Sequence, residues 1–381
     1  MSDKPVSPDP DSDRPQSPSR RRALESMLVA GAALATGVHA ALPPAGRQSA
    51  SRATRNARLD AALRKRVGHV VVIYCENRSF NNVFADFPGL EQPLSSPPPQ
   101  RFLQRDRDGS ILKRLPPIWH GLVPHKQELD GKAWHIGQDA ITGLANAPWK
   151  LRSPAGEPLP LALVTSSPVH RFYLNQMQIN GGSNDGFVAW GDHGALQMGY
   201  YADHASDLRL WRLARDYTLL DNFFMGAFGG SFLAHQYLIA ARPPTYPDAD
   251  RSPARDEIAV LEDGPEGHRL KLADDSPASA LDGVPTFASD AQLTPDFHAV
   301  NTFGPPYAPS FNTDPKNPLL ADLSKKDIIP PQDYPTIGDA LSARGVDWAW
   351  YGGGWQMALD GKGKHGLSDK FPPSPNFQAH H

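Results

Sequence analysis

Residues 67–75 read VGHVVVIYC and form a nearly continuous run of apolar, mostly β-branched side chains. A run of this kind is typical of a strand that is buried on both faces in the centre of a parallel sheet. It stops abruptly at the polar residues 76–79, ENRS. Because ligands of open α/β sheets bind at the carboxyl ends of the strands, we expect a functional site at this point.

Six further segments have the pattern of helices or strands. The predicted helices are residues 167–179, 207–216, 231–241 and 335–344, and the predicted strands are residues 217–224 and 346–351. The last helix, Gly345 and the last strand form half of another α/β unit. We therefore expect an α/β fold with a central, mostly parallel sheet, from which residues 242–332, rich in Pro, Asp, Ala and Ser, depart as a surface excursion.

Composition excludes several classes of protein. The 381 residues carry 38 basic and 41 acidic side chains, a net charge of −3, so there is no basic field for a nucleic acid partner. The 39 prolines and 32 glycines predict long loops and disfavour a helical bundle. Cys75 is the only cysteine, so any metal must be held by oxygen and nitrogen.

The N-terminal residues 1–40 have the features of an export signal. We expect residues 1–19, polar and rich in proline, to be disordered, and Arg20–Arg22 then precede the apolar residues 27–41. This segment resembles a twin-arginine signal with cleavage after Ala40, although a basic-flanked membrane anchor or a chance arginine cluster would look similar. It predicts a periplasmic or secreted protein that uses the twin-arginine export machinery and has no stable transmembrane segment after signal removal, because the apolar run is short.

The first candidate site is Glu76-Asn77, at the end of the predicted buried strand. A carboxylate and an amide carbonyl supply the hard oxygen ligands that a divalent cation prefers. The alternative is a strand-end turn whose polar side chains cap the next helix. The pattern by itself leaves both interpretations open.

The second candidate site follows a run of glycines, Gly226, Gly229 and Gly230, which leads to Ser231. Ser231 is placed in the first turn of a predicted helix, where unpaired N–H groups and the helix dipole attract anions, so it could attack phosphorus. The alternative is an ordinary N-cap serine. His235 lies four residues later on the same helix face, beside the serine or simply half-buried.

His170 is the third candidate, at the start of the predicted helix 167–179. Asp185 and Gly186, after the end of that helix, are expected to be structural turn residues. Five other histidines lack metal-ligand spacing and are expected on the surface or in packing contacts, namely His120, His125, His135, His193 and His204.

Several motifs in order resemble one family. They are HVVVIYCENRSFNNVFADFPG, HRFYLNQMQINGGSNDGF, DNFFMGAFGGSFLAHQYLIAA and GVDWAWYGGGW, followed by the terminal HH. They resemble the bacterial phosphoesterase family that contains non-haemolytic phospholipases C and related acid phosphatases, and the acid phosphatase branch in particular. The resemblance spans roughly residues 67–381, so the domain expected after the signal is residues 41–381.

The resemblance implies an alkaline-phosphatase-like α/β sandwich and a serine that is transiently phosphorylated beside a divalent cation. By position, Glu76 and Asn77 match metal ligands, and Ser231 matches both the nucleophile and a further metal contact. His170 matches an active-site histidine. Such a cation would neutralise phosphoryl charge and favour the serine alkoxide.

Three further histidines are expected to bind substrate. His235 is expected there because of its position near Ser231, and His380 or His381 because the resemblance implies a second active-site histidine.

The sequence departs from the family pattern at three points. Ala234 replaces an asparagine and Asn81 replaces an aspartate. The family also completes its metal site with an acidic pair after a later strand, so we expect this chain to be a partial domain whose sheet is incomplete at the C-terminus. The acidic pairs at 256–257, 262–263 and 274–275 are expected to be solvated surface charges.

These observations predict an exported, metal-dependent phosphomonoesterase of the acid phosphatase type, with doubtful activity for this chain alone. The nearest alternative is a phospholipase C-type phosphodiesterase acting on phospholipid. An alternative of another class is an exported, non-catalytic protein that binds phosphate esters.

Overall fold

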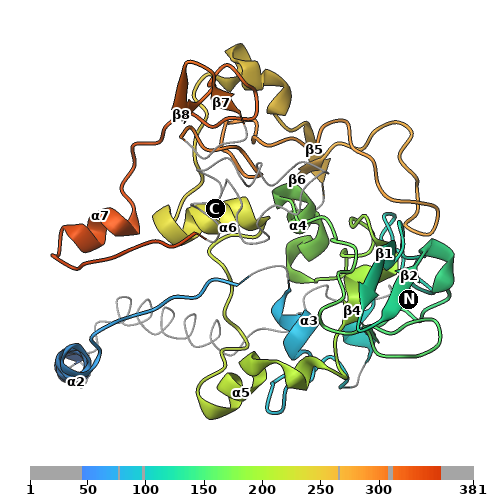
Figure 1. Ribbon diagram of the computed structural model, residues 1–381, viewed down its shortest axis with the longest axis horizontal. Coiled ribbons are helices and arrows are strands. Elements are labelled where there is room, and N and C mark those ends of the chain that lie inside the picture. Colours follow the sequence, from blue (N-terminus) through green and yellow to red (C-terminus); the bar gives the residue numbers. More distant parts are fainter. Residues whose placement is uncertain (1–44, 76–77, 97–98, 265–266, 308–311, 353–381) are drawn as a thin grey trace, which may run out of the picture. The chain divides into compact units, whose positions relative to one another are not determined.

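The computed structural model describes residues 45–75, 78–96, 99–264, 267–307 and 312–352 (Figure 1). The chain divides into two compact units, one ending at Tyr74 and the other beginning at Cys75. The described part of the first unit is α2 (Ala45–Arg66) followed by residues 67–74. Among the described residues, none of the helices combines the length and the apolar composition needed to span a bilayer.

The buried strand predicted for residues 67–75 is not formed. Residues 70–73 belong to no strand, and the side chains of Val70 and Ile73 are each 81% exposed. Apolar, β-branched residues suit a strand, but a strand is stable only when a second backbone supplies ladder hydrogen bonds and a core covers its faces. Within the described ranges, residues 70–73 have neither.

The second unit contains five α-helices among its described residues. They are α3 (Phe80–Phe84), α4 (Phe172–Ile179), α5 (Arg209–Asp216), α6 (Ser231–Ala240) and α7 (Ile337–Ser342). All four predicted helices are therefore confirmed, although the first starts at Phe172 and not at Ser167. Short 3-10 helices cover 99–102, 138–140, 180–182, 194–198, 205–207, 249–251 and 253–257.

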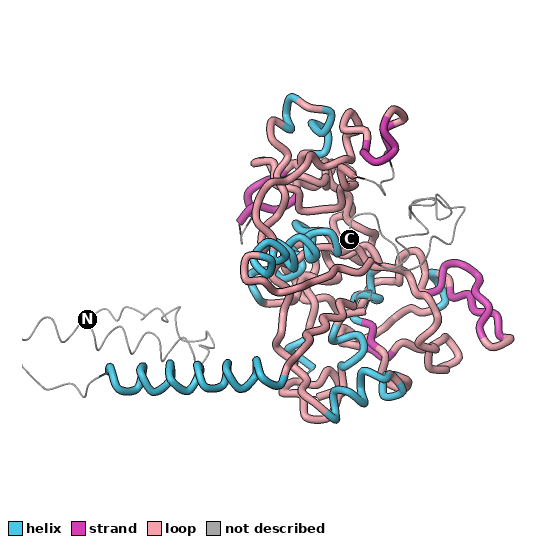
Figure 2. Tube along the Cα trace, turned by 60° about the vertical axis from the view of Figure 1, so that its left-hand side comes forward, coloured by secondary structure: helices cyan, strands magenta, loops and turns pink. Residues whose placement is uncertain are grey.

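The described strands form four separate two-stranded sheets. Three are antiparallel, β1 (Val123–Leu129) with β2 (Lys132–Ile136), β5 (Leu261–Gly264) with β6 (Gly267–Leu270), and β7 (Thr313–Asp314) with β8 (Asn317–Ala321), while β3 (Trp149–Lys150) and β4 (Gly199–Tyr200) are parallel. Figure 2 shows that loops connect these short elements throughout the second unit, as the proline and glycine content predicts.

The central, mostly parallel sheet is therefore not present in the described residues, although helices and strands are mixed. The predicted strands 217–224 and 346–351 are wrong for the same reason as residues 67–75, because no neighbouring strand pairs with them among the described residues. Their apolar side chains are exposed, Tyr217 by 79% and Tyr351 by 92%.

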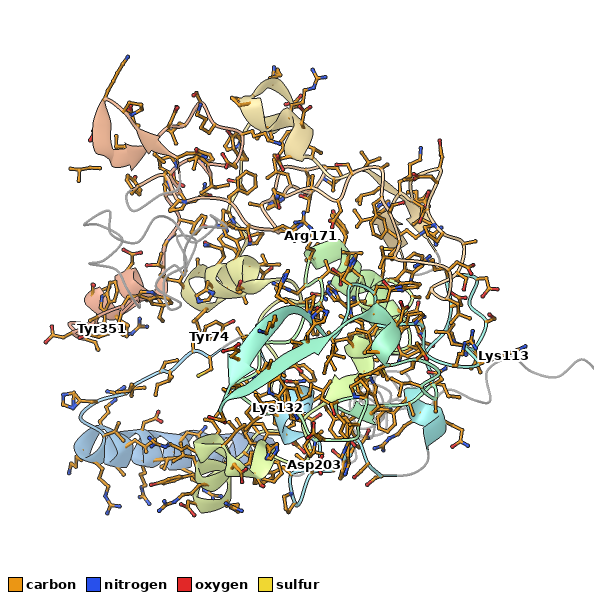
Figure 3. The ribbon with its side chains drawn as sticks, turned by 45° about the vertical axis from the view of Figure 1, so that its right-hand side comes forward. Tyr74, Lys113, Lys132, Arg171, Asp203 and Tyr351 are labelled. Atoms are coloured by element: carbon orange, nitrogen blue, oxygen red, sulfur yellow. The ribbon has the colours of Figure 1, made fainter. Side chains whose placement is uncertain are left out.

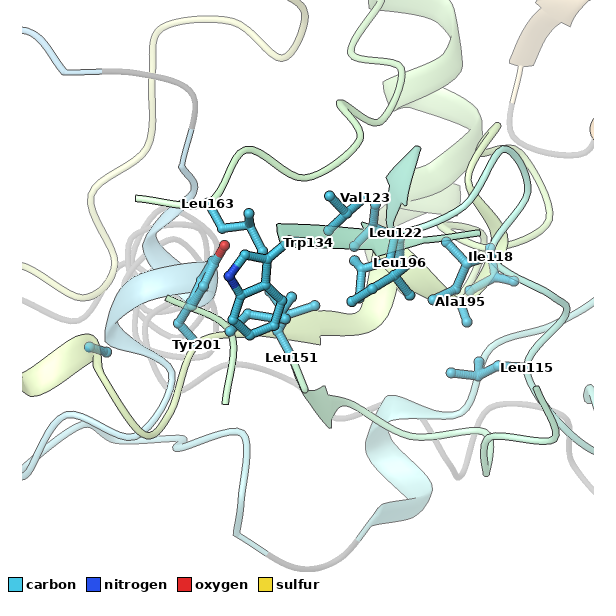
Figure 4. Close-up of a cluster of buried hydrophobic side chains, with 14 of the residues drawn as sticks. Leu115, Ile118, Leu122, Val123, Trp134, Leu151, Leu163, Ala195, Leu196 and Tyr201 are labelled. Carbon is cyan, nitrogen blue, oxygen red and sulfur yellow. The ribbon is translucent and has the colours of Figure 1, made fainter. Parts of the chain in front are cut away.

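Three hydrophobic clusters hold the second unit together. The largest surrounds β1 and β2 and includes Val123, Trp134 and Leu196 (Figure 4). A second cluster packs Phe232 of α6 with Tyr246, Leu293, Phe303 and Ile329, among others. A third packs Tyr173, Leu174 and Met177 of α4 against Ala259 and Leu270. These contacts fix the N-terminal ends of α4 and α6, which carry the candidate site.

Residues 242–332 supply much of the second and third clusters and the strands β5–β8. One expected surface charge is wrong here. Glu257 is only 8% exposed, and its carboxylate forms an ion pair of 2.5 Å with Lys326. Pairing with lysine allows this carboxylate to be buried.

Candidate functional site

Ser231 is the first residue of α6, and Gly230 is the N-cap residue. Ser231 therefore does not act as the N-cap. Its side chain is half-buried, and no hydrogen bond to its Oγ is formed by the described residues. The hydroxyl lies beside N–H groups of the first helical turn that have no partner within the helix, a position that favours an anion.

The glycine run before Ser231 packs tightly against the helix that follows. A Cβ atom on Gly226 would lie 2.9 Å from the Tyr237 ring, and one on Gly229 would lie 3.0 Å from the Leu233 side chain. The glycines therefore allow the loop to approach α6 closely.

His170 precedes α4 by two residues. Its Nδ1 lies 2.8 Å from the carbonyl oxygen of Pro168. Because a carbonyl oxygen can only accept, Nδ1 carries the proton, and in the neutral ring Nε2 is left with the lone pair. The ring is exposed, so Nε2 can take a proton from a substrate or water and return it.

The structure brings Ser231 and His170 together. Both line a cleft of about 260 Å³, together with Asp192, Asn301 and neighbouring residues. Gly230, the residue before Ser231, packs directly against His170, since a Cβ atom on Gly230 would lie 2.7 Å from the carbonyl oxygen of His170 and 3.2 Å from its Cδ2. Only glycine at position 230 permits this approach.

Arg171, labelled in Figure 3, also borders the cleft, but its guanidinium is engaged elsewhere. It forms an ion pair of 2.7 Å with Asp290 and donates to the carbonyl oxygens of Asp290 and Ala291 at 2.8 and 3.0 Å. Burial raises the pKa of the Asp290 carboxyl, although the charge of Arg171 lowers it. Arg171 therefore anchors the start of α4 to the 290–292 segment.

Asp192 provides the carboxylate of the cleft. Its Oδ1 accepts hydrogen bonds from the Val169 N–H at 2.9 Å and from His193 Nδ1 at 2.6 Å. Burial alone would raise the pKa of Asp192, but the hydrogen bonds from His193 and Val169 lower it below its ordinary value. Asp192 is therefore anionic at neutral pH.

His235 is buried in α6 and is not among the residues that line the cleft. Its Nδ1 lies 2.8 Å from the backbone carbonyl oxygen of Ser231, four residues earlier. His235 therefore lies beside Ser231, as its spacing predicts, but this contact is with the backbone carbonyl oxygen of the serine. Of the five histidines expected on the surface or in packing, His193 is buried and its ring lies 5.4 Å from that of His120.

Four of the expected site residues, Glu76, Asn77, His380 and His381, lie outside the described residues. Among those that are described, no group of three or more His, Cys, Asp or Glu side chains could hold a metal ion. The cleft offers the Ser231 hydroxyl and the Asp192 carboxylate. These are the hard donors that a divalent cation needs, but too few to bind one alone.

Sequence reasoning missed Asp192 and Asn301. Neither lies in a recognisable motif, and each reaches the His170 segment from a distant part of the chain. The one local signal was that Asp192 and His193 are adjacent, which could have indicated a hydrogen bond between their side chains.

The sequence matches a family model described as "Phosphoesterase family" over residues 67–381. No curated protein matches it.

Proposed function

Because this chain belongs to the phosphoesterase family, whose members hydrolyse phosphoric esters, we propose that it is an exported phosphomonoesterase with Ser231 as its nucleophile. The observation that carries the proposal is the contact between the Ser231 and His170 segments in one cleft. A nucleophile at a helix N-terminus and an imidazole that can exchange protons are the two groups that such a reaction needs.

In the first step the Ser231 hydroxyl proton passes to solvent and Oγ forms a bond to phosphorus. The bond from phosphorus to the ester oxygen breaks, and that oxygen takes a proton from protonated His170. In the second step a water oxygen bonds to phosphorus, and one of its protons passes to neutral His170. The bond to Ser231 Oγ then breaks, and the serine regains a proton from solvent.

The N–H groups of the first turn of α6 bind the phosphoryl oxygens during both steps. A divalent cation held by Glu76, Asn77 and Ser231 would stabilise the phosphoryl charge and favour the serine alkoxide.

The test of the nucleophile is the Ser231→Ala variant, assayed for turnover of a chromogenic phosphate monoester. We expect its turnover to be lost, while Ser183→Ala, an exposed serine outside the cleft, keeps wild-type turnover. Full activity of Ser231→Ala would show that Ser231 is not the nucleophile. For the metal, we expect dialysis against a chelator to abolish turnover and a divalent cation to restore it.

A phospholipase C-type activity is a second candidate function. It is favoured by exposed apolar side chains just before the glycine run, including Tyr217, Leu220, Phe223 and Phe224, which suit contact with acyl chains. Faster release of phosphocholine from phosphatidylcholine vesicles than of phosphate from simple monoesters would favour this function. Binding of phosphate esters without hydrolysis at any cation concentration would favour a non-catalytic binding protein.

Export is proposed from residues 1–40, which lie outside the described residues. Replacing Arg20, Arg21 and Arg22 by lysine should keep the protein in the cytoplasm. An unchanged periplasmic or secreted fraction would contradict a twin-arginine signal.

A further inference from the structure

The segment that carries His170 is held on both sides by hydrogen bonds to its backbone. The N–H of Val169 donates to Asp192 Oδ1 at 2.9 Å, and the N–H of Phe172 donates to Asn301 Oδ1 at 3.1 Å. Between them, the imidazole itself is held by the Pro168 carbonyl oxygen. The orientation of the His170 ring therefore depends on where the backbone of residues 168–169 lies.

The two side chains that accept these backbone hydrogen bonds, Asp192 and Asn301, differ in their surroundings. Asn301 is 4% exposed and also donates to the Ala291 carbonyl oxygen, so it ties the start of α4 to the interior. Asp192 borders the cleft, and its side chain is 37% exposed.

The position of the Asp192 carboxylate is in turn fixed by His193. His193 has a side chain that is only 11% exposed, and its Nδ1 lies 2.6 Å from Asp192 Oδ1. Two donors therefore converge on one oxygen of the carboxylate. A charge-assisted hydrogen bond is stronger than a neutral one, so the anionic form of Asp192 holds the Val169 N–H most firmly.

We propose that Asp192 is a positioning residue for His170, which it orients through the Val169 backbone while His193 fixes the carboxylate. This inference rests on the proposed function and deepens it. The Asp192 bond sets the plane of the Pro168–Val169 peptide group, and the Pro168 carbonyl oxygen of that same group then selects the tautomer protonated on Nδ1. Nε2 remains the nitrogen that exchanges protons with the leaving group and with water.

The kinetic test compares three variants of the full chain with a chromogenic monoester. Asp192→Ala removes the acceptor and should lower kcat by about tenfold or more with KM changed less than about twofold, because a misplaced proton donor affects the reaction and not substrate binding. Asp192→Asn keeps an acceptor oxygen and should recover most of kcat. The control is Asp203→Ala, which removes an aspartate whose carboxylate pairs with Arg152 away from the cleft, and it should match the wild type.

Equal kcat values for Asp192→Ala and Asp203→Ala would overturn the proposal, as would Asp192→Asn being as slow as Asp192→Ala. Loss of turnover in Ser231→Ala together with an unchanged Asp192→Ala would refute the positioning role and leave the proposed function intact.

A second measurement does not depend on activity. In protein labelled with ¹⁵N-histidine, the His170 signal, assigned by its loss in His170→Gln, should show protonation on Nδ1 in the wild type and in Asp192→Asn. In Asp192→Ala it should shift toward the Nε2-protonated form that dominates in free histidine. If Asp192→Ala does not fold, Asp192→Ser, too short to reach Val169, replaces it. An unchanged tautomer in the folded variant would overturn the proposal even if the protein had no hydrolase activity.

Discussion

Gly230→Ala is the most direct test of the contact between the serine and histidine segments. The added Cβ atom would lie 2.7 Å from the His170 carbonyl oxygen, whereas ordinary van der Waals contact begins at 3.4 Å. The atom that must give way belongs to the backbone, so it cannot rotate aside. The two segments must therefore separate by up to about 0.7 Å.

The expected cost has two parts. Overpacking of this size costs about 1–3 kcal/mol of stability. A displacement approaching 1 Å at a catalytic group can cost about 100-fold in rate, so we expect kcat/KM for a chromogenic monoester to fall by about tenfold. Thermal unfolding and steady-state kinetics on the same preparation measure both.

Gly137→Ala is a matched control for this variant. Gly137 has φ −73° and ψ 179°, close to the φ −80° and ψ −179° of Gly230, and both are cap residues before a helix. A Cβ atom on Gly137 meets nothing within 4 Å. If the two alanine variants had the same kcat/KM, the steric contact at Gly230 would have no part in positioning the site.

Three further predictions concern buried polar groups and are measured by unfolding in urea. Arg171→Met should destabilise the protein by about 3–5 kcal/mol at neutral pH, because it leaves Asp290 buried without its cation, and the loss should shrink as the pH falls through the raised pKa of Asp290. Asn146→Ala should cost about 3 kcal/mol at any pH, because the buried Asn146 amide makes three hydrogen bonds to the backbone of Gln104 and Leu112. Asp192→Asn should be less stable than the wild type above pH 3.8, the ordinary pKa of aspartate, and the difference should disappear as the pH falls through the lowered pKa of Asp192. A constant difference across that range would show that the charge of Asp192 does not contribute to stability.

The helices were predictable because their signals are local. The glycine run before Ser231 and the Thr336 capping box before α7 both act within a few residues of the helix start. The strands were not, because an apolar run shows only that side chains suit a sheet. Pairing depends on a second segment, and none pairs with residues 217–224 or 346–351 among the described residues.

The positions of two candidate site residues were predictable to the same degree. Ser231 and His170 each stand at a helix start that the sequence marks, and both line the cleft. The residues that hold the His170 segment in place are Asp192 and Asn301. No spacing in the sequence links either of them to His170. Contacts of this kind depend on the tertiary fold, which local patterns do not encode.

The charges of the cleft explain why a cation would be needed. The Arg171 guanidinium faces Asp290 and cannot offset charge at Ser231, while Asp192 remains anionic at neutral pH. The N-terminus of α6 contributes about half a positive charge, far less than the two negative charges of a phosphate monoester. Without another positive group, the substrate and Asp192 would repel each other in a confined site. Protonation of His170 supplies one positive charge, but that charge is lost when the proton passes to the leaving oxygen in the first step. A divalent cation would supply two and leave the histidine free to move protons, so the charge balance of the described residues supports the metal dependence that we propose.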